Sequence, residues 1–170
     1  MRIFLVGFMG AGKSSVGRAL ARQLGALFFD LDARVEAVFS ASVAAIFAQY
    51  GEAVFRAAES RQLARCGGFP RVVVATGGGT FVSEANRALI RHLGVSVHLD
   101  VPWGEVLRRL PGKRTERPLF ANPEQAHRLY VERLPAYRQA DLSVRPARCE
   151  TPELLAARIA LQLQELTCGT

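Results

Sequence analysis

The stretch of sequence that decides the fold is Gly7-Phe8-Met9-Gly10-Ala11-Gly12-Lys13-Ser14. It matches the pattern G-x-x-x-x-G-K-[ST], in which glycines allow successive backbone N–H groups to turn inward around bound phosphates. The apolar run at 3–6 has the length of a buried strand, and residues 14–24 carry apolar side chains at helical spacing. A phosphate-binding loop between a strand and a helix predicts an α/β fold.

Two side chains of this loop have predictable tasks. Lys13 is placed to reach the β and γ phosphates of a nucleoside triphosphate, and the Ser14 hydroxyl is a Mg²⁺ ligand in loops of this pattern. The N-terminus of the following helix adds the positive end of its dipole. The alternative is a glycine-rich turn that binds no nucleotide. We favour a site for ATP and Mg²⁺, with contacts from Gly10, Ala11, Gly12, Lys13, Ser14 and Ser15.

Apolar runs of strand length recur along the chain, at 27–29, 72–75, 95–99 and around 142–145. Segments of helical spacing separate them, and this alternation predicts a parallel sheet covered by helices on both faces. Ligands of such sheets bind beyond the carboxyl ends of the strands. We therefore expect the glycine-rich loop to meet two further segments, each of which follows a predicted strand: Asp30-Leu31-Asp32 and Gly77-Gly78-Gly79.

Asp30 and Asp32 are candidate catalytic carboxylates. At strand spacing both side chains leave the same side of the chain, at the edge of the sheet where the triphosphate binds. One carboxylate would hold the hydrated Mg²⁺, and the other would accept a proton from the attacking hydroxyl. The alternative is a solvated turn that caps the next helix. Asp100, which ends the run 95–99, is an alternative Mg²⁺ ligand.

A second group of candidate residues points to a substrate with a carboxylate. Phe55-Arg56-x-x-Glu59 lies in a predicted helix, where residues three apart share a face. Arg56 could bind the carboxylate while Glu59 holds its guanidinium in place; a surface salt bridge is the alternative. The glycines at 77–79 would let backbone amides approach a ligand closely, with a plain tight turn as the alternative.

The composition restricts the partners of the chain. The formal net charge is +7, and the excess lies mainly in 105–148, which suits small polyanions better than nucleic acid because there is no basic tail. Three isolated cysteines and the lack of a long apolar run predict a cytoplasmic protein that binds no membrane. We expect a monomer, and we expect a mobile lid at about 111–123 because three prolines and four charges lie there.

The combined pattern resembles the shikimate kinase family. Its elements occur in the family's order and spacing over nearly the whole chain: the loop at 7–14, Asp30-x-Asp32, Phe55-Arg56-x-x-Glu59, Gly77–Gly79, Arg117-Pro118-Leu119 and Tyr137-Arg138. The resemblance implies a single P-loop kinase domain over residues 1–170, with a three-layer α/β/α fold and a five-stranded parallel sheet of order 2-3-1-4-5. It also implies phosphoryl transfer from ATP to the 3-hydroxyl of shikimate, in aromatic amino-acid biosynthesis.

The resemblance implies roles for individual residues as well. Asp30 would help Ser14 to hold Mg²⁺, and Asp32 would grip the reacting hydroxyl as the candidate base. Arg56 and Arg138 would bind the shikimate carboxylate. The expected catalytic residues are Lys13, Asp32 and Arg117, the last as a lid arginine over the transferring phosphoryl group. The adenine-side arginine would be Arg108 or Arg109, and the remaining substrate contacts would be Phe47, Phe55, Gly77, Gly78 and Gly79.

Two other functions stay open at the level of the sequence. Another small-metabolite kinase, for gluconate or a nucleoside monophosphate, would keep the loop but not a pair of arginines facing a carboxylate. A basic nucleic-acid-binding ATPase would show turnover that polynucleotides stimulate and binding that weakens steeply with salt. The guanine-specifying pattern N/T-K-x-D is absent, which argues against a switch GTPase.

Overall fold

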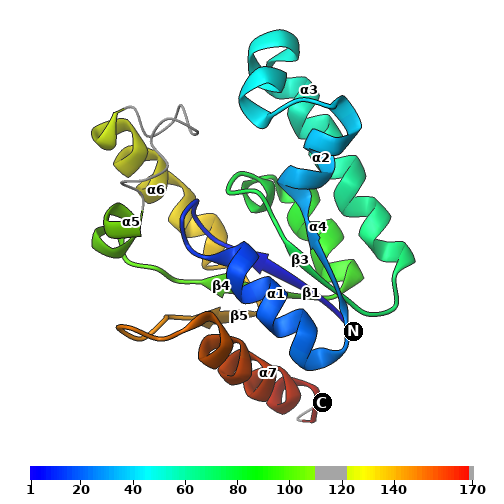
Figure 1. The fold of residues 1–170 in the computed structure, drawn as a ribbon, viewed down its shortest axis with the longest axis vertical. Coiled ribbons are helices and arrows are strands. Elements are labelled where there is room, and N and C mark those ends of the chain that lie inside the picture. Colours follow the sequence, from blue (N-terminus) through cyan, green and yellow to red (C-terminus); the bar gives the residue numbers. More distant parts are fainter. Residues whose placement is uncertain (110–121, 169–170) are drawn as a thin grey trace.

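The computed structural model describes residues 1–109 and 122–168. Within them, five parallel strands form one sheet of order β2-β3-β1-β4-β5 (Figure 1). The strands are β1 (Arg2–Val6), β2 (Leu27–Asp30), β3 (Val72–Ala75), β4 (Val95–Leu99) and β5 (Leu142–Val144). The predicted sheet and its strand order are confirmed.

The middle of the sheet is buried on both faces because its side chains are apolar throughout. The residues Ile3 to Val6 of β1 are at most 1% exposed, and the four residues of β3 are buried as well. In the parallel register, Phe4 lies opposite Val74 of β3 and Ser96 of β4. The carboxyl ends of these strands therefore meet at one edge of the sheet, where the loop that begins at Gly7 also lies.

Helices cover both faces of the sheet. Figure 1 shows α1 (Lys13–Leu24) and α7 (Pro152–Cys168) side by side on one face, with α4 (Glu84–Leu93) on the other. The helices α2 (Leu31–Phe39) and α3 (Val43–Arg65) lie next to each other beyond the end of β2. The remaining helices, α5 (Trp103–Arg109) and α6 (Pro123–Tyr137), flank the residues that the structure does not describe.

Helix α3 consists of two helical segments on either side of Gly51, as the sequence pattern predicts. At the kink between them, Gly51 has φ 81° and ψ 165°. A positive φ is accessible to glycine at little cost, so this residue can change the direction of the helix. Ile46 and Phe55, which lie on either side of the kink, pack with Val35 of α2 in a small core of their own. This core anchors the helix that carries Arg56.

The segment expected to form a lid, 111–123, lies almost entirely outside the described residues. Its last residue, Pro123, is the first residue of α6, and the side chain of Asn122 caps this helix by accepting hydrogen bonds from the backbone N–H groups of Glu124 and Gln125. No helix in the described ranges is long and apolar enough to span a membrane.

Candidate active site

The loop between β1 and α1 adopts the conformation that its glycines allow. Gly7, Gly10 and Gly12 have φ values of 138°, 79° and 93°, a region that residues with side chains rarely enter. A Cβ atom on Gly7 would also lie 3.0 Å from the carbonyl oxygen of Leu99 in β4. Gly12 is the N-cap of α1. The backbone amides of the loop therefore lie at the N-terminus of that helix, where its dipole is positive.

Lys13 is folded into this loop. Its Nζ donates hydrogen bonds to the carbonyl oxygens of Gly7, at 2.8 Å, and Phe8, at 2.9 Å, and the residue is only 9% exposed. The ammonium group is therefore held at the centre of the loop by neutral acceptors. A phosphate oxygen that enters the loop can replace these carbonyls with a stronger, charged acceptor.

Asp30 connects the loop to the start of α2. Its Oδ2 accepts a hydrogen bond of 2.5 Å from the Ser14 hydroxyl, while its Oδ1 accepts from the backbone N–H groups of Asp32 and Ala33. The strand ends at Asp30, so Asp32 lies in the first turn of α2 and the strand spacing expected of the two acids is wrong. Leu31, which begins the helix, is fully buried, and Asp30 is the N-cap in front of it. Asp30 therefore both caps α2 and contacts Ser14 of the loop.

The pair of Ser14 and Asp30 fits a hard divalent cation. Both supply oxygen atoms, and these lie 2.5 Å apart in a partly buried position at the mouth of the loop. The described residues contain no group of three or more His, Cys, Asp or Glu side chains that could hold a metal ion by themselves. Mg²⁺ is commonly bound by one or two protein oxygens together with phosphates and water.

Asp32 and Glu59 converge on the glycines that follow β3. A Cβ atom on Gly77 would lie closer than 3.0 Å to both Oδ1 of Asp32 and Oε1 of Glu59. Only glycine leaves room for two carboxylates at this point. Glu59 is fully buried, and its two oxygens accept hydrogen bonds from the Thr80 hydroxyl, at 2.5 Å, and from Nη1 of Arg56, at 2.9 Å.

Arg56 is held in place beside Gly79. A Cβ atom on Gly79 would clash with the Arg56 guanidinium, so here too the absence of a side chain makes room for a neighbouring one. Burial alone would lower the pKa of Arg56, but the carboxylates of Glu59 and Glu52 more than offset this and raise the pKa above its usual value. The aromatic rings of Phe47 and Phe55 lie 4.9 Å apart against this guanidinium. The structure thus assembles this part of the expected substrate site.

Arg138 is not part of this assembly. It is an exposed residue at the C-cap of α6, and its side chain makes no hydrogen bond or ion pair within the described ranges. Arg133, on the same helix, is instead 8% exposed, and its Nη1 lies 3.2 Å from the point that a Cβ atom on Gly78 would occupy. Five residues along a helix correspond to a rotation of about 140°, so the two arginines leave α6 in different directions.

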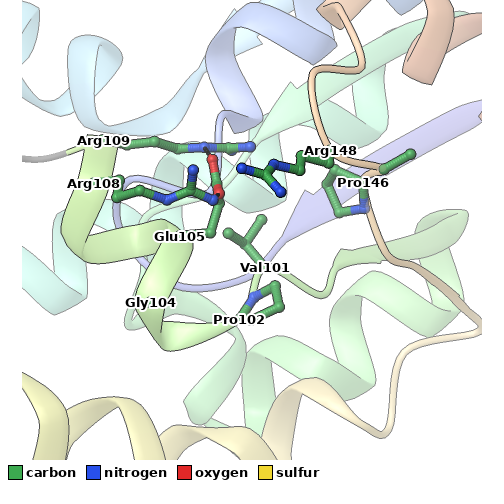
Figure 2. A pocket seen from close by; sticks show the side chains of 9 residues that line it. Val101, Pro102, Gly104, Glu105, Arg108, Arg109, Pro146 and Arg148 are labelled. Atoms are coloured by element: carbon green, nitrogen blue, oxygen red, sulfur yellow. Dashed lines mark hydrogen bonds and ion pairs between the residues drawn. The ribbon is translucent and has the colours of Figure 1, made fainter.

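A pocket of about 440 Å³ opens on the other side of the loop, between α5 and the segment that follows β5 (Figure 2). Arg109 bridges the pocket and the loop, because its Nη1 donates to the carbonyl oxygen of Ala11 at 3.2 Å and its Nε donates to Glu105. Figure 2 shows Arg109 and Arg148 directed toward one another across the pocket. Arg108 and Arg109, expected on the adenine side, both line this pocket, and so does Arg148, which the sequence did not single out because the segment after β5 carries no recognisable pattern.

Asp100, the alternative Mg²⁺ ligand, has a different partner. Its Oδ2 accepts hydrogen bonds from Nε and Nη2 of Arg145, at 2.9 and 2.5 Å. This ion pair connects the end of β4 with the end of β5 and leaves Asp30 as the carboxylate at Ser14.

His98 of β4 is buried beside the loop. It is 3% exposed, and its Nδ1 lies 3.1 Å from the Ser143 hydroxyl of β5. Burial lowers the pKa of His98 from 6.5 to about 4, against the opposing effect of Asp100 and with help from the positive charge of Lys13. The imidazole is therefore neutral at pH 7 in the folded protein.

This neutral histidine predicts a loss of stability in mild acid. Between pH 6.5 and pH 4 the unfolded chain binds a proton at His98 that the folded chain does not, so stability falls as the pH falls through this window. We expect about 2 kcal/mol of the free energy of unfolding to be lost at this site between pH 7 and pH 5. Urea unfolding of the parent and of His98→Gln at both pH values measures this difference. His92→Gln, which removes an exposed histidine of α4, should keep the parental dependence of the free energy of unfolding on pH. An equal change of this free energy with pH in all three proteins would contradict the prediction.

Known proteins resemble this chain over nearly its whole length. The sequence model of the shikimate kinase family matches residues 9–164. The shikimate kinase of Gloeobacter violaceus is 44% identical over 167 residues, which cover 93% of this chain and 94% of the relative. The chain belongs to the shikimate kinase family. Among solved structures, the shikimate kinase of Aquifex aeolicus superimposes with a TM-score of 0.89 and 35% identity over 100% of both chains.

Shikimate kinases are small-molecule kinases with ATP as the phosphoryl donor, and the chain is therefore an enzyme of that class. The shikimate kinase of Acinetobacter baumannii, solved in complex with shikimate, has a TM-score of 0.89 at 35% identity and covers 96% of this chain and 93% of that one. A gluconokinase from Sinorhizobium meliloti has a TM-score of 0.56 at 20% identity, covering 97% of this chain and 96% of its own. That likeness shows a shared fold alone.

Proposed function

We propose that this shikimate kinase transfers the γ-phosphoryl group of ATP to the 3-hydroxyl of shikimate, with the roles of its residues set out below. The observation that carries the proposal is the convergence of Asp32, Arg56 and Arg133 on the glycines 77–79, at the carboxyl edge of the sheet and next to the phosphate-binding loop. Two guanidinium groups and one carboxylate suit a substrate that has an acid at one end and a reacting hydroxyl at the other.

Arg56 and Arg133 form the end of the site that takes the substrate carboxylate. Each guanidinium can offer two parallel N–H donors to a carboxylate, and both are restrained before the substrate arrives. Arg56 donates hydrogen bonds to Glu59 and Glu52, and the side chain of Arg133 is buried. Phe47 and Phe55 supply the apolar wall beside them. We assign to Arg133 the task that the resemblance implied for Arg138.

Asp32 lies at the other end, where the hydroxyl reacts. Its carboxylate lies beside Gly77, whereas Arg133 lies beside Gly78 and Arg56 beside Gly79. From there it can hold the 3-hydroxyl by a hydrogen bond and accept its proton as the new P–O bond forms. Positioning contributes as much as proton transfer, because attack requires the oxygen to lie in line with the leaving group of the γ-phosphate.

The nucleotide occupies the opposite side of the loop. The backbone amides of Gly10 to Ser15 and Lys13 surround the phosphates, and the pocket beside Arg109 and Pro146 receives the adenine ring. Ser14 and Asp30 would hold Mg²⁺, which supplies positive charge to the β and γ phosphates when bound. Arg117 lies outside the described residues, so its expected role over the transferring phosphoryl group stays a prediction from the sequence.

Release of ADP with one added acceptor at a time tests the function. The acceptors are shikimate, gluconate, a nucleoside monophosphate and RNA, each with ATP and Mg²⁺. We expect turnover with shikimate and only background hydrolysis with the others. A response to gluconate or to the monophosphate would support the other kinase hypothesis, and a response to RNA would support the nucleic-acid-binding ATPase.

The assignment of Arg133 predicts a specific loss of shikimate affinity. Arg133→Lys keeps the charge but loses the planar pair of donors, so shikimate should bind about ten- to a hundredfold more weakly while the KM for ATP changes less than twofold. Arg138→Lys is the matched control on the same helix, and it should leave both constants unchanged. Isothermal titration with shikimate measures the effect. If Arg138→Lys were the damaging variant, the carboxylate site would have to be rebuilt around the exposed arginine.

A further inference from the structure

Tyr137 is a large, fully buried side chain next to the proposed substrate site. It ends α6, is 1% exposed, and its hydroxyl donates a hydrogen bond of 2.5 Å to the carbonyl oxygen of Gly78. Nη1 of Arg133 and this hydroxyl oxygen lie 3.2 and 3.9 Å from the point that a Cβ atom on Gly78 would occupy, so both face the same glycine. One phenol thus connects the glycine segment after β3 to the arginine that we assign to the substrate carboxylate.

The contact with Gly78 also fixes the next peptide group. A trans peptide is planar, with its N–H pointing away from its C=O. With the Gly78 carbonyl directed at Tyr137, the N–H of Gly79 is directed away from α6. A Cβ atom on Gly78 would lie 3.5 Å from the backbone N of Met9, so this peptide borders the phosphate-binding loop. Any rotation of the peptide would change both the position of Arg133 and this border.

The ring of Tyr137 is itself supported from below. His98 of β4 stacks on it with ring centroids 5.4 Å apart and an angle of 26° between the planes, and Ser143 of β5 holds the imidazole. Burial raises the pKa of the Tyr137 hydroxyl to about 12, with Arg133 acting in the opposite direction. The phenol therefore stays protonated at neutral pH and remains a donor to Gly78.

We propose that Tyr137 is a positioning residue for substrate recognition, which holds the Arg133 guanidinium and the Gly78–Gly79 peptide in the arrangement that receives the shikimate carboxylate. The inference rests on the proposed function, since it assigns the arginine to that carboxylate. It goes beyond it by naming a group that touches neither substrate and yet sets the affinity for only one of them.

A second tyrosine of α6 separates this role from a merely structural one. Tyr130 is buried on the same helix, 9% exposed, and its hydroxyl donates to a backbone carbonyl oxygen, that of Val101, at 3.2 Å. Tyr137→Phe and Tyr130→Phe therefore make the same chemical change, the loss of one buried phenol–carbonyl hydrogen bond. Only the first is connected to Arg133 and Gly78.

The test compares the full-length parent with the two variants, first by thermal unfolding and then by steady-state kinetics with ATP and shikimate. For Tyr137→Phe we expect a KM for shikimate about tenfold above that of the parent, a kcat within about threefold, and an unchanged KM for ATP. Both variants should melt at a lower temperature than the parent, by similar amounts. Tyr130→Phe should keep the parental kcat and the parental KM values for both substrates. The carboxamide analogue of shikimate gives the decisive comparison: Tyr137→Phe should cost it less than twofold, because Arg133 has no carboxylate to hold.

Each outcome decides between the alternatives. A shikimate KM within twofold of the parent, equal effects of the two variants, or an equal penalty for shikimate and its carboxamide would overturn the positioning role. Calorimetric titration of shikimate without nucleotide should show the same loss for Tyr137→Phe, independent of turnover. Failure of the proposed function itself is distinguishable, since the parent would then show neither turnover with shikimate nor heat of binding.

Discussion

Replacement of Lys13 by methionine should lower the rate of phosphoryl transfer by about a thousandfold or more, while the protein remains folded at the assay temperature. Negative charge spreads over the oxygens of the phosphoryl group as it is transferred, and Lys13 is the cation of the loop that meets this charge. Methionine keeps the long apolar stem and removes only the ammonium group. The measurement is kcat with saturating ATP and shikimate.

The same substitution has a smaller cost in stability, which the structure makes visible. In the absence of nucleotide the ammonium of Lys13 satisfies the carbonyl oxygens of Gly7 and Phe8. Their loss should cost about 1–3 kcal/mol in the free energy of unfolding, far less than the effect on the transition state. Differential scanning calorimetry in the absence of ligand measures this part separately.

Arg22→Met is the matched control for charge. Arg22 lies on the same helix α1, nine residues further on, and its side chain forms an ion pair with Glu153 at the surface. It removes the same net charge, so its turnover should stay within twofold of the parent. If Lys13→Met retained near-parental turnover, or if Arg22→Met lost as much, the assignment of the loop to the phosphates would be untenable.

The second large effect concerns Asp32. Asp32→Asn keeps the size of the side chain but removes the charge and the ability to take a proton, so kcat should fall by about 10²–10⁴-fold. The KM for ATP should change little, because the carboxylate faces the glycine segment at Gly77 rather than the phosphates. Steady-state kinetics with each substrate varied in turn distinguishes the two constants.

Asp30→Asn is the natural comparison, since the two acids differ in their contacts. Asparagine is as good an N-cap as aspartate, so α2 should keep its start. The variant loses a charged oxygen beside Ser14 and should therefore need a higher Mg²⁺ concentration for half-maximal rate. At saturating Mg²⁺ it should recover more activity than Asp32→Asn. The reverse ranking would exchange the roles of the two acids.

The strands were predictable because they are short, apolar runs between polar turns, and all five lie within two residues of the predicted ranges. Their order in the sheet was not predictable from such runs, since β1, β3 and β4 are all buried strands and their sequences carry no mark of their neighbours. That order came from the resemblance to shikimate kinases. The loop at 7–14 was predictable for a different reason, because its glycines, Lys13 and Ser14 each perform a backbone or phosphate task.

The substrate end of the site was predicted only in part, and helix geometry explains the difference. Arg56 and Glu59 lie three residues apart, and the structure joins them as the pattern indicates. On α6 the buried residues are Ala126, Tyr130, Arg133 and Tyr137, spaced by four, three and four. An arginine within an apolar stripe of helical period is the signal that points to Arg133, whereas Arg138 lies off the stripe. The start of α2 at Leu31 carried no comparable signal, since Asp30 both ends a strand and caps a helix.

The strand order has a consequence for folding during synthesis on the ribosome. Of the five strands of this sheet, β1 is synthesised before the others, and it is the middle strand of the finished sheet, between β3 and β4. Neither partner exists until synthesis has passed Ala75 and then Leu99. During that time the apolar residues Ile3 to Val6 lack the strands against which they pack in the native sheet. Such delayed, non-local pairing makes folding slow and favours aggregation. We therefore expect nascent chains shorter than about 100 residues to depend on a chaperone, and the phosphate-binding loop to be among the last parts of the enzyme to take its shape.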